Sequence, residues 1–172
     1  MHLPPLLLLP LFLAATALSQ TTLPEGYRQV IINTIWNAKF AVQAQTPLKA
    51  GSGIILYTVA SATNPKPEQQ WWIKDGNTKV QLAGTGWCLD AGSGRSNGSP
   101  LTIQECAATK ASQNWVYQTE GSYLVLDQAS GTKLCVDLYT GSVRDNTKIV
   151  LWQCINGDKN HQWPVKNVTA TP

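Results

Sequence analysis

The sequence predicts an all-β domain built from three repeated units. A tryptophan that follows a short polar lead-in recurs as Trp71, Trp115 and Trp163, at spacings of 44 and 48 residues. Short alternating segments fill each unit and are separated by turns rich in Gly, Asn, Asp and Ser. No stretch after the N-terminal leader shows sustained helical periodicity. A repeat of this length indicates that each unit needs its neighbours to bury its apolar face.

The first 19 residues form an apolar leader that ends in Ala17-Leu18-Ser19, a small-x-small cleavage pattern. A membrane anchor is the alternative, but the apolar run is short and interrupted by proline. The leader also lacks Lys and Arg, which are usual in a signal peptide. We expect a signal peptide at 1–19, secretion to the extracellular space, and one domain over 20–172 with repeats at about 27–74, 75–118 and 119–166.

The number and distribution of charged residues limit the kinds of ligand that the chain is expected to bind. Charged residues make up 13% of the chain, against a usual share of about 25%. The formal net charge is +3, and the Lys and Arg residues are scattered along the sequence. No basic stripe is available to follow a phosphate backbone, so the sequence argues against nucleic acid as a ligand.

The repeats can be aligned on a three-residue segment that precedes a turn in each repeat and is called the corner below. The triplets Cys-Leu-Asp at 88–90 and Cys-Val-Asp at 135–137 correspond to Ala-Val-Gln at 41–43 in the first repeat. On the following segment, Tyr57, Gln104 and Trp152 occupy one equivalent position. The first repeat has therefore lost both cysteines and the acidic residue.

Four cysteines in a secreted chain indicate two disulfides, for which three connectivities are possible. The pairing that respects the repeat joins Cys88 to Cys106 and Cys135 to Cys154, at separations of 18 and 19 residues. A zinc site would require a CxxC pair or a histidine partner, and neither accompanies these cysteines. We predict no metal and no cofactor.

Two sequons, at Asn97 and Asn167, are candidates for N-glycosylation in a secreted protein.

The triplicated Gln-x-Trp pattern and the paired Cys-x-Asp corners resemble the ricin B-like lectins, also classed as family-13 carbohydrate-binding modules. The resemblance covers residues 27–166 and implies a β-trefoil fold. It also implies glycans or glycoproteins as partners. The β-trefoil rests on this resemblance and on the triplication, because turn spacing alone does not separate a trefoil from another barrel or a sandwich.

The third repeat holds the most complete set of candidate sugar contacts. By the resemblance, Asp137 would accept hydrogen bonds from two sugar hydroxyls, Trp152 would stack on the apolar face of the ring, and Asn160 would donate to a hydroxyl. The family preference that follows is galactose or N-acetylgalactosamine. The full carbohydrate-binding set comprises Asp137, Tyr139, Gly141, Trp152, Asn160 and His161.

This sequence departs from the family at two positions of that repeat. Val150 and His161 stand where glutamine is common, so one or two polar contacts are missing or altered. Histidine changes charge near neutral pH, and we therefore expect weaker sugar binding under acidic conditions. The alternative for this repeat is purely structural, with Asp137 capping a turn, Trp152 in the core and Asn160 holding a loop.

The other two repeats are degenerate. In the second repeat, Asp90 and Gln113 remain while Gln104 replaces the stacking aromatic and Ser112 replaces the asparagine, so we expect weak or no binding. The first repeat has Gln43 in place of the acid, but it has Tyr57 for stacking and Glu68-Gln69 before its closing tryptophan. We expect it to be structural, and an unusual binding site is the alternative.

Two rival functions remain open. The sequence after the leader offers one histidine and no hydrolase motif, so we predict that the protein is not an enzyme. A β-trefoil protease inhibitor or protein-binding module with vestigial sugar sites is the stronger rival. The proline-rich insertion at 61–68 would be its reactive segment.

Overall fold

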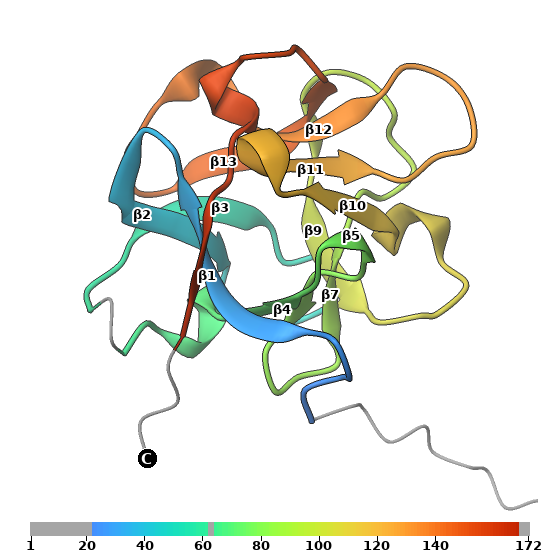
Figure 1. Ribbon diagram of the computed structural model, residues 1–172. Helices are drawn as coiled ribbons and strands as arrows, with labels where there is room; N and C mark the ends of the chain where they lie inside the picture. Colours follow the sequence, from blue (N-terminus) through green and yellow to red (C-terminus); the bar gives the residue numbers. More distant parts are fainter. Residues whose placement is uncertain (1–21, 62–63, 169–172) are drawn as a thin grey trace, which may run out of the picture.

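The computed structural model describes residues 22–61 and 64–168 (Figure 1). The predicted signal peptide at 1–19 lies outside these ranges. The described chain consists of fourteen β-strands and five short 3-10 helices. None of these helices has the length and apolar character needed to cross a membrane.

Each repeat contributes strands and a closing 3-10 helix. The first contains β1 (Arg28–Thr34), β2 (Asn37–Ala44), β3 (Ile54–Thr58), η1 (Pro67–Gln69) and β4 (Trp71–Ile73). The second contains β5 (Gly76–Thr78), β6 (Gln81–Leu82), β7 (Trp87–Asp90), β8 (Ser99–Pro100), β9 (Thr102–Glu105), η2 (Ala111–Gln113) and β10 (Trp115–Gln118). The third contains η3 (Glu120–Ser122), β11 (Tyr123–Leu126), β12 (Leu134–Leu138), η4 (Tyr139–Gly141), β13 (Thr147–Gln153), η5 (Lys159–His161) and β14 (Val165–Asn167).

The strands form one continuous network in which every pairing between named strands is antiparallel. The hairpins β2–β3, β7–β9 and β12–β13 are equivalent between repeats. Their registers place Ala41 opposite Tyr57, Cys88 opposite Gln104, and Cys135 opposite Trp152. The alignment made from sequence is therefore confirmed at these positions.

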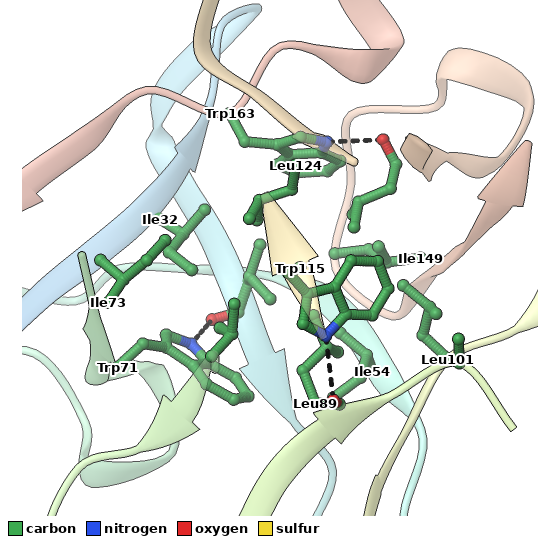
Figure 2. Close-up of a cluster of buried hydrophobic side chains, with 14 of the residues drawn as sticks. Ile32, Ile54, Trp71, Ile73, Leu89, Leu101, Trp115, Leu124, Ile149 and Trp163 are labelled. Carbon is green, nitrogen blue, oxygen red and sulfur yellow. Dashed lines mark hydrogen bonds between the residues drawn. The ribbon is translucent and has the colours of Figure 1, made fainter. Parts of the chain in front are cut away.

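The three closing tryptophans form the centre of the core (Figure 2). Trp71, Trp115 and Trp163 are fully buried, as predicted. Each indole Nε1 donates to a main-chain carbonyl of its own repeat's corner, at Val42 (3.0 Å), Leu89 (3.1 Å) and Val136 (2.9 Å) respectively. A buried indole needs such an acceptor, and these bonds tie the end of each repeat to its corner.

The repeats also close on one another in a cycle. A turn near the start of each repeat donates a main-chain hydrogen bond to the closing segment of the preceding repeat. Ala83 N–H bonds Gln70 O at 2.9 Å, and Asp127 N–H bonds Asn114 O at 2.9 Å. Ile35 N–H completes the cycle by bonding Gln162 O at 3.2 Å. A turn of the first repeat therefore lies against the end of the third.

Two disulfides fasten the second and third hairpins. The bonds join Cys88 to Cys106 and Cys135 to Cys154, the pairing that the repeat alignment favours. Each closes a short loop and should contribute about 3 kcal/mol on the chain-entropy model. In the third repeat the bond lies next to Trp152, so it also fixes the hairpin that carries the candidate site.

The two sequon asparagines lie at the surface. Asn97 is exposed, and its Oδ1 accepts a hydrogen bond from Gln153 N–H at 2.7 Å. Asn167 is exposed on β14 opposite Val30, while Thr169 of the same sequon lies outside the described residues. Glycosylation at either position stays a prediction.

Candidate functional site

The candidate site of the third repeat lies on the β12–β13 hairpin. Cys135 and Asp137 are two residues apart on one strand, so their side chains share a face of the hairpin. Trp152 lies opposite Cys135 and is therefore diagonal to Asp137, within reach of a long side chain. Trp152 is half-buried, unlike the three closing tryptophans. The hairpin thus carries a carboxylate and an accessible indole on one face.

Asp137 is held from behind by His161. Its carboxylate Oδ2 lies 3.0 Å from His161 Nε2, and both side chains are buried. On the other side of the imidazole, Ile155 N–H donates to Nδ1 at 3.3 Å. A nitrogen that accepts is unprotonated in the neutral ring, so the proton of neutral His161 lies on Nε2, the nitrogen that is 3.0 Å from Asp137 Oδ2. His161 thereby orients the carboxylate.

This geometry corrects the expectation that His161 contacts a sugar. Its side chain is fully buried, so it reaches a ligand only through Asp137. The other departure from the family, Val150, is also buried and contributes no polar contact.

The electrostatics of His161 follow from its surroundings. Burial lowers the pKa of His161 because it disfavours the charged ring. The hydrogen bond and negative charge of Asp137 raise it by more, with a further contribution from Asp158, so the net pKa is above the ordinary value of 6.5.

Asn160 lies at the edge of the site. The side chain of Asp158 caps η5 by accepting from Asn160 N–H at 2.9 Å. Asn160 Oδ1 accepts from the indole Nε1 of Trp36 at 3.0 Å. Its amide nitrogen has no hydrogen-bond acceptor within the described chain.

The turn at η4 borders Asn160 closely. Gly141 has a φ of +65°, and a Cβ placed there would lie 3.0 Å from Asn160 Oδ1. Both the backbone conformation and this close approach therefore favour glycine. Tyr139, in the same turn, is 43% exposed. Five of the six predicted residues are thus accessible or border the accessible face, and His161 lies beneath them.

The second repeat has a carboxylate at the equivalent position, but groups within the protein bind it. Asp90 is completely buried and accepts from Gly92 N–H at 2.7 Å and Gln113 Nε2 at 3.0 Å. The ammonium of Lys110 lies 2.7 Å from its Oδ2. Burial raises the pKa of Asp90, but these partners, Lys110 foremost, lower it by more, and the net pKa is below its ordinary value. Ser112 also bonds the carboxylate and contributes to this shift.

The stacking position of the second repeat is filled by half-buried Gln104, which has no π-face. Because of Lys110 and the missing aromatic, the second repeat lacks the combination of a lysine-free carboxylate and an accessible indole that the third repeat has. Sequence reasoning identified the loss of the aromatic but missed Lys110. The available signal was that a lysine stands directly before the closing helix.

The aromatic residue of the first repeat also contacts a lysine. Lys66 Nζ lies over the ring of Tyr57, 4.6 Å from its centroid. Gln43 replaces the carboxylate, and its Oε1 is buried with no hydrogen-bond donor among the described residues. The same holds for Oε1 of Gln69, whose Nε2 donates to Thr58 O at 3.1 Å. The corner of this repeat therefore has no carboxylate, although Glu68 lies three residues before Trp71, where the third repeat has Asn160 before Trp163. The loss of the corner carboxylate favours a structural role.

The proline-rich insertion is held against the body of the domain. Pro65 is buried, and its carbonyl accepts from Gln70 Nε2 at 2.7 Å. The contact of Lys66 with Tyr57 anchors the next residue. These contacts disfavour a protruding reactive loop in the described part of the insertion.

Comparison with known proteins identifies the fold and the family. The comparison with curated proteins finds no match. Among solved structures, the designed threefold-symmetric protein ThreeFoil superposes with a TM-score of 0.67 at 20% identity, covering 84% of this chain and 100% of that one. A Polyporus squamosus lectin bound to Neu5Aca2-6Galb1-4GlcNAc gives 0.64 at 16% identity, over 83% of this chain and 50% of that one.

An earthworm R-type lectin C-half in complex with GalNAc gives a TM-score of 0.60 at 15% identity, over 81% of this chain and 98% of that one. These likenesses confirm the predicted β-trefoil fold. The family model of the ricin-type beta-trefoil lectin domain matches residues 29–163, which span all three closing tryptophans. The chain therefore belongs to the ricin-type β-trefoil lectin family.

Proposed function

We propose that this protein is a secreted, non-catalytic lectin that binds galactose- or N-acetylgalactosamine-type glycans through its third repeat. One observation carries the proposal. Only the third repeat, among the described residues, combines an oriented carboxylate free of any lysine with an accessible indole on the same face, Asp137 and Trp152.

The chemistry of a pyranose fits this pair of residues. A sugar ring has one apolar face of C–H groups and a rim of hydroxyls, so it requires a flat aromatic and a few fixed polar groups. Trp152 would stack on the apolar face. Asp137 would accept from two adjacent hydroxyls, and a charged acceptor makes stronger hydrogen bonds than a neutral one.

Selectivity would come from the fixed positions of these polar groups. His161 holds one carboxylate oxygen of Asp137, and Trp36 and Gly141 confine Asn160. An epimer with one hydroxyl misplaced would leave a carboxylate or amide unpaired, which costs affinity. The earthworm and Polyporus lectins were solved with ligands that contain GalNAc or Gal. These ligands support testing galacto-configured sugars first.

The remaining parts of the proposal rest on other features. The apolar leader at 1–19 and two disulfides favour an oxidising, extracellular location. A glycosidase requires two carboxylates that act together on one bond. Asp90 and Asp137 each pair with a residue of their own repeat, which does not favour such joint use. Glycans or glycoproteins are the expected partners.

A single shallow site implies modest affinity. We expect a Kd on the order of 0.1 to 1 mM for a monosaccharide, because few of its atoms are buried. Dense glycans or several copies of the protein would raise the effective affinity.

The test is a calorimetric titration of the mature protein with galactose, N-acetylgalactosamine and glucose. We expect the two galacto-sugars to bind with a stoichiometry of one, and the binding to disappear in Trp152→Ala. The matched control is Gln104→Ala, the same position in the second repeat, which should bind as the native protein does. Absence of binding by the native protein, or undiminished binding by Trp152→Ala, would refute the proposal.

A further inference from the structure

We propose that Trp36 forms a second aromatic contact beside the third-repeat site, and that this site recognises a disaccharide or longer glycan in preference to a single sugar. The inference rests on the proposed function and extends it to the size of the ligand. It concerns a residue more than 100 positions from Asp137 in sequence.

Trp36 is positioned by the cyclic closure of the domain. The turn between β1 and β2 is fixed to the end of the third repeat by the bond from Ile35 N–H to Gln162 O. Trp36 Nε1 then donates to Asn160 Oδ1 at 3.0 Å, which places the indole beside the site.

The exposure of this indole sets it apart from the core tryptophans. Half of the Trp36 side chain, 50%, is exposed to solvent. Lys159 Nζ lies over its ring, 5.0 Å from the centroid, and comes from the same short helix as Asn160. One hydrogen bond and one cation–π contact therefore hold the ring in place. Lys159 covers part of one ring face, and half of the residue's surface is still exposed.

The equivalent turns of the other repeats carry no aromatic residue. The shared main-chain bond makes Ile35, Ala83 and Asp127 equivalent, so the residues that follow them are Trp36, Gly84 and Gln128. The same cycle brings Gly84 toward the first repeat and Gln128 toward the second. Among the described turns, the third repeat, whose carboxylate has no lysine partner, is the one that receives an indole from its neighbour.

A glycan of two sugar units matches this layout. The first unit would bind Asp137 and Trp152, with Asn160 donating to one of its hydroxyls. A second unit on the Asn160 side would place its C–H face against Trp36 and its hydroxyls near the ammonium of Lys159. A monosaccharide in the first position would leave the exposed indole uncovered.

The experiment measures the ratio of galactose Kd to disaccharide Kd. The probes are galactose, lactose (galactose β1-4 linked to glucose) and melibiose (galactose α1-6 linked to glucose), titrated by calorimetry. We expect the native protein to bind at least one disaccharide about threefold to tenfold more tightly than galactose, the range expected for one aromatic contact. In Trp36→Ala the ratio should fall to near one.

Two further variants separate the contact from indirect effects. Ile35→Ala removes a neighbouring side chain that is 45% exposed and should keep the native ratio. Trp36→Phe keeps a flat ring but loses the donor to Asn160, and it should retain most of the ratio. If the ratio of galactose Kd to disaccharide Kd also fell to near one in Trp36→Phe, Trp36 would act only by holding Asn160. That result would overturn the proposed contact between Trp36 and the second sugar unit.

The outcomes also distinguish this inference from the proposed function. Equal affinities of the native protein for galactose and both disaccharides would overturn the inference and leave the proposed lectin function intact. A Kd ratio in Trp36→Ala as high as in the native protein would do the same. Native protein that binds none of the three sugars would overturn both.

Discussion

The second and third repeats share a hairpin, a disulfide and a carboxylate, and they differ most at the residue before the closing 3-10 helix. In the second repeat this residue is Lys110, whose ammonium lies 2.7 Å from Asp90. In the third it is Asp158, whose carboxylate turns back to accept from Asn160 N–H. This residue therefore pairs with the carboxylate in one repeat and leaves it without a lysine partner in the other.

The difference teaches that a carboxylate alone does not make a sugar site. Asp90 has acceptor capacity comparable to Asp137, but Gly92, Gln113 and Lys110 use it within the protein. Among the described residues, the carboxylate of Asp137 has one charged or hydrogen-bonding partner, His161, which leaves lone pairs for a ligand. A carboxylate can bind a ligand only with the acceptor lone pairs that its hydrogen bonds within the protein leave unused.

The largest effect is expected from removing the charge at Asp137. In Asp137→Asn, the amide oxygen would face the Nε2 proton of His161, so the amide nitrogen would face the sugar and could not accept from a hydroxyl. We expect galactose affinity to fall at least about tenfold in a calorimetric titration.

The matched variant Asp90→Asn should leave galactose affinity unchanged. It should instead lower the free energy of unfolding by about 1–3 kcal/mol, because two N–H donors and Lys110 would face an amide. Urea unfolding measures this change. A galactose affinity that fell equally in both variants would break the comparison between the repeats.

The fold and the core were predictable because they repeat. Three tryptophans at nearly equal spacing identified the units, and the corner triplets fixed the hairpin register and the disulfide pairs. These features depend on positions that all three units share, so the alignment of one unit with another was sufficient.

The details of the site depend on contacts between unlike positions, which alignment does not reveal. Lys110 covers Asp90 through a long side chain from another element, and Trp36 reaches Asn160 from a different repeat. The burial of His161 was missed for the same reason. Its motif position identified it as a neighbour of the site, but only the packing shows that it lies behind Asp137.

A gain of function would sharpen the comparison further. The variant Gln104→Trp/Lys110→Ser/Ser112→Asn gives the second repeat an indole, an uncovered carboxylate and the missing asparagine. Serine at 110 can cap η2 without adding a second negative charge beside Asp90. We expect the stoichiometry of galactose binding to rise from one to two, with a millimolar second Kd on the order of that expected for a shallow site.

The controls for this transplant are Gln104→Trp alone and Lys110→Ser alone. The first should fail because Lys110 still occupies the carboxylate, and the second because no aromatic is present. A second site in either single variant would show that one of the two differences is unimportant.

The smallest effect is the pH dependence set by His161. Its pKa is raised above 6.5 in the folded protein by Asp137 and Asp158, against the opposing effect of burial. Its contribution to stability is therefore fully present below the unfolded pKa and is lost as pH rises through the folded pKa. The stability of the native protein relative to His161→Gln, measured by urea unfolding, should decrease over that window.

Sugar affinity should move in the opposite direction. Protonated His161 neutralises part of the Asp137 charge that would hold the sugar hydroxyls, so galactose binding should weaken about threefold at acidic pH. In His161→Gln the affinity should be flat with pH, because glutamine can hold the carboxylate as Gln113 holds Asp90 without titrating. A flat native profile between about pH 5 and 8 would contradict the role of His161, because its imidazolium would lie 3.0 Å from the carboxylate that we propose holds the sugar.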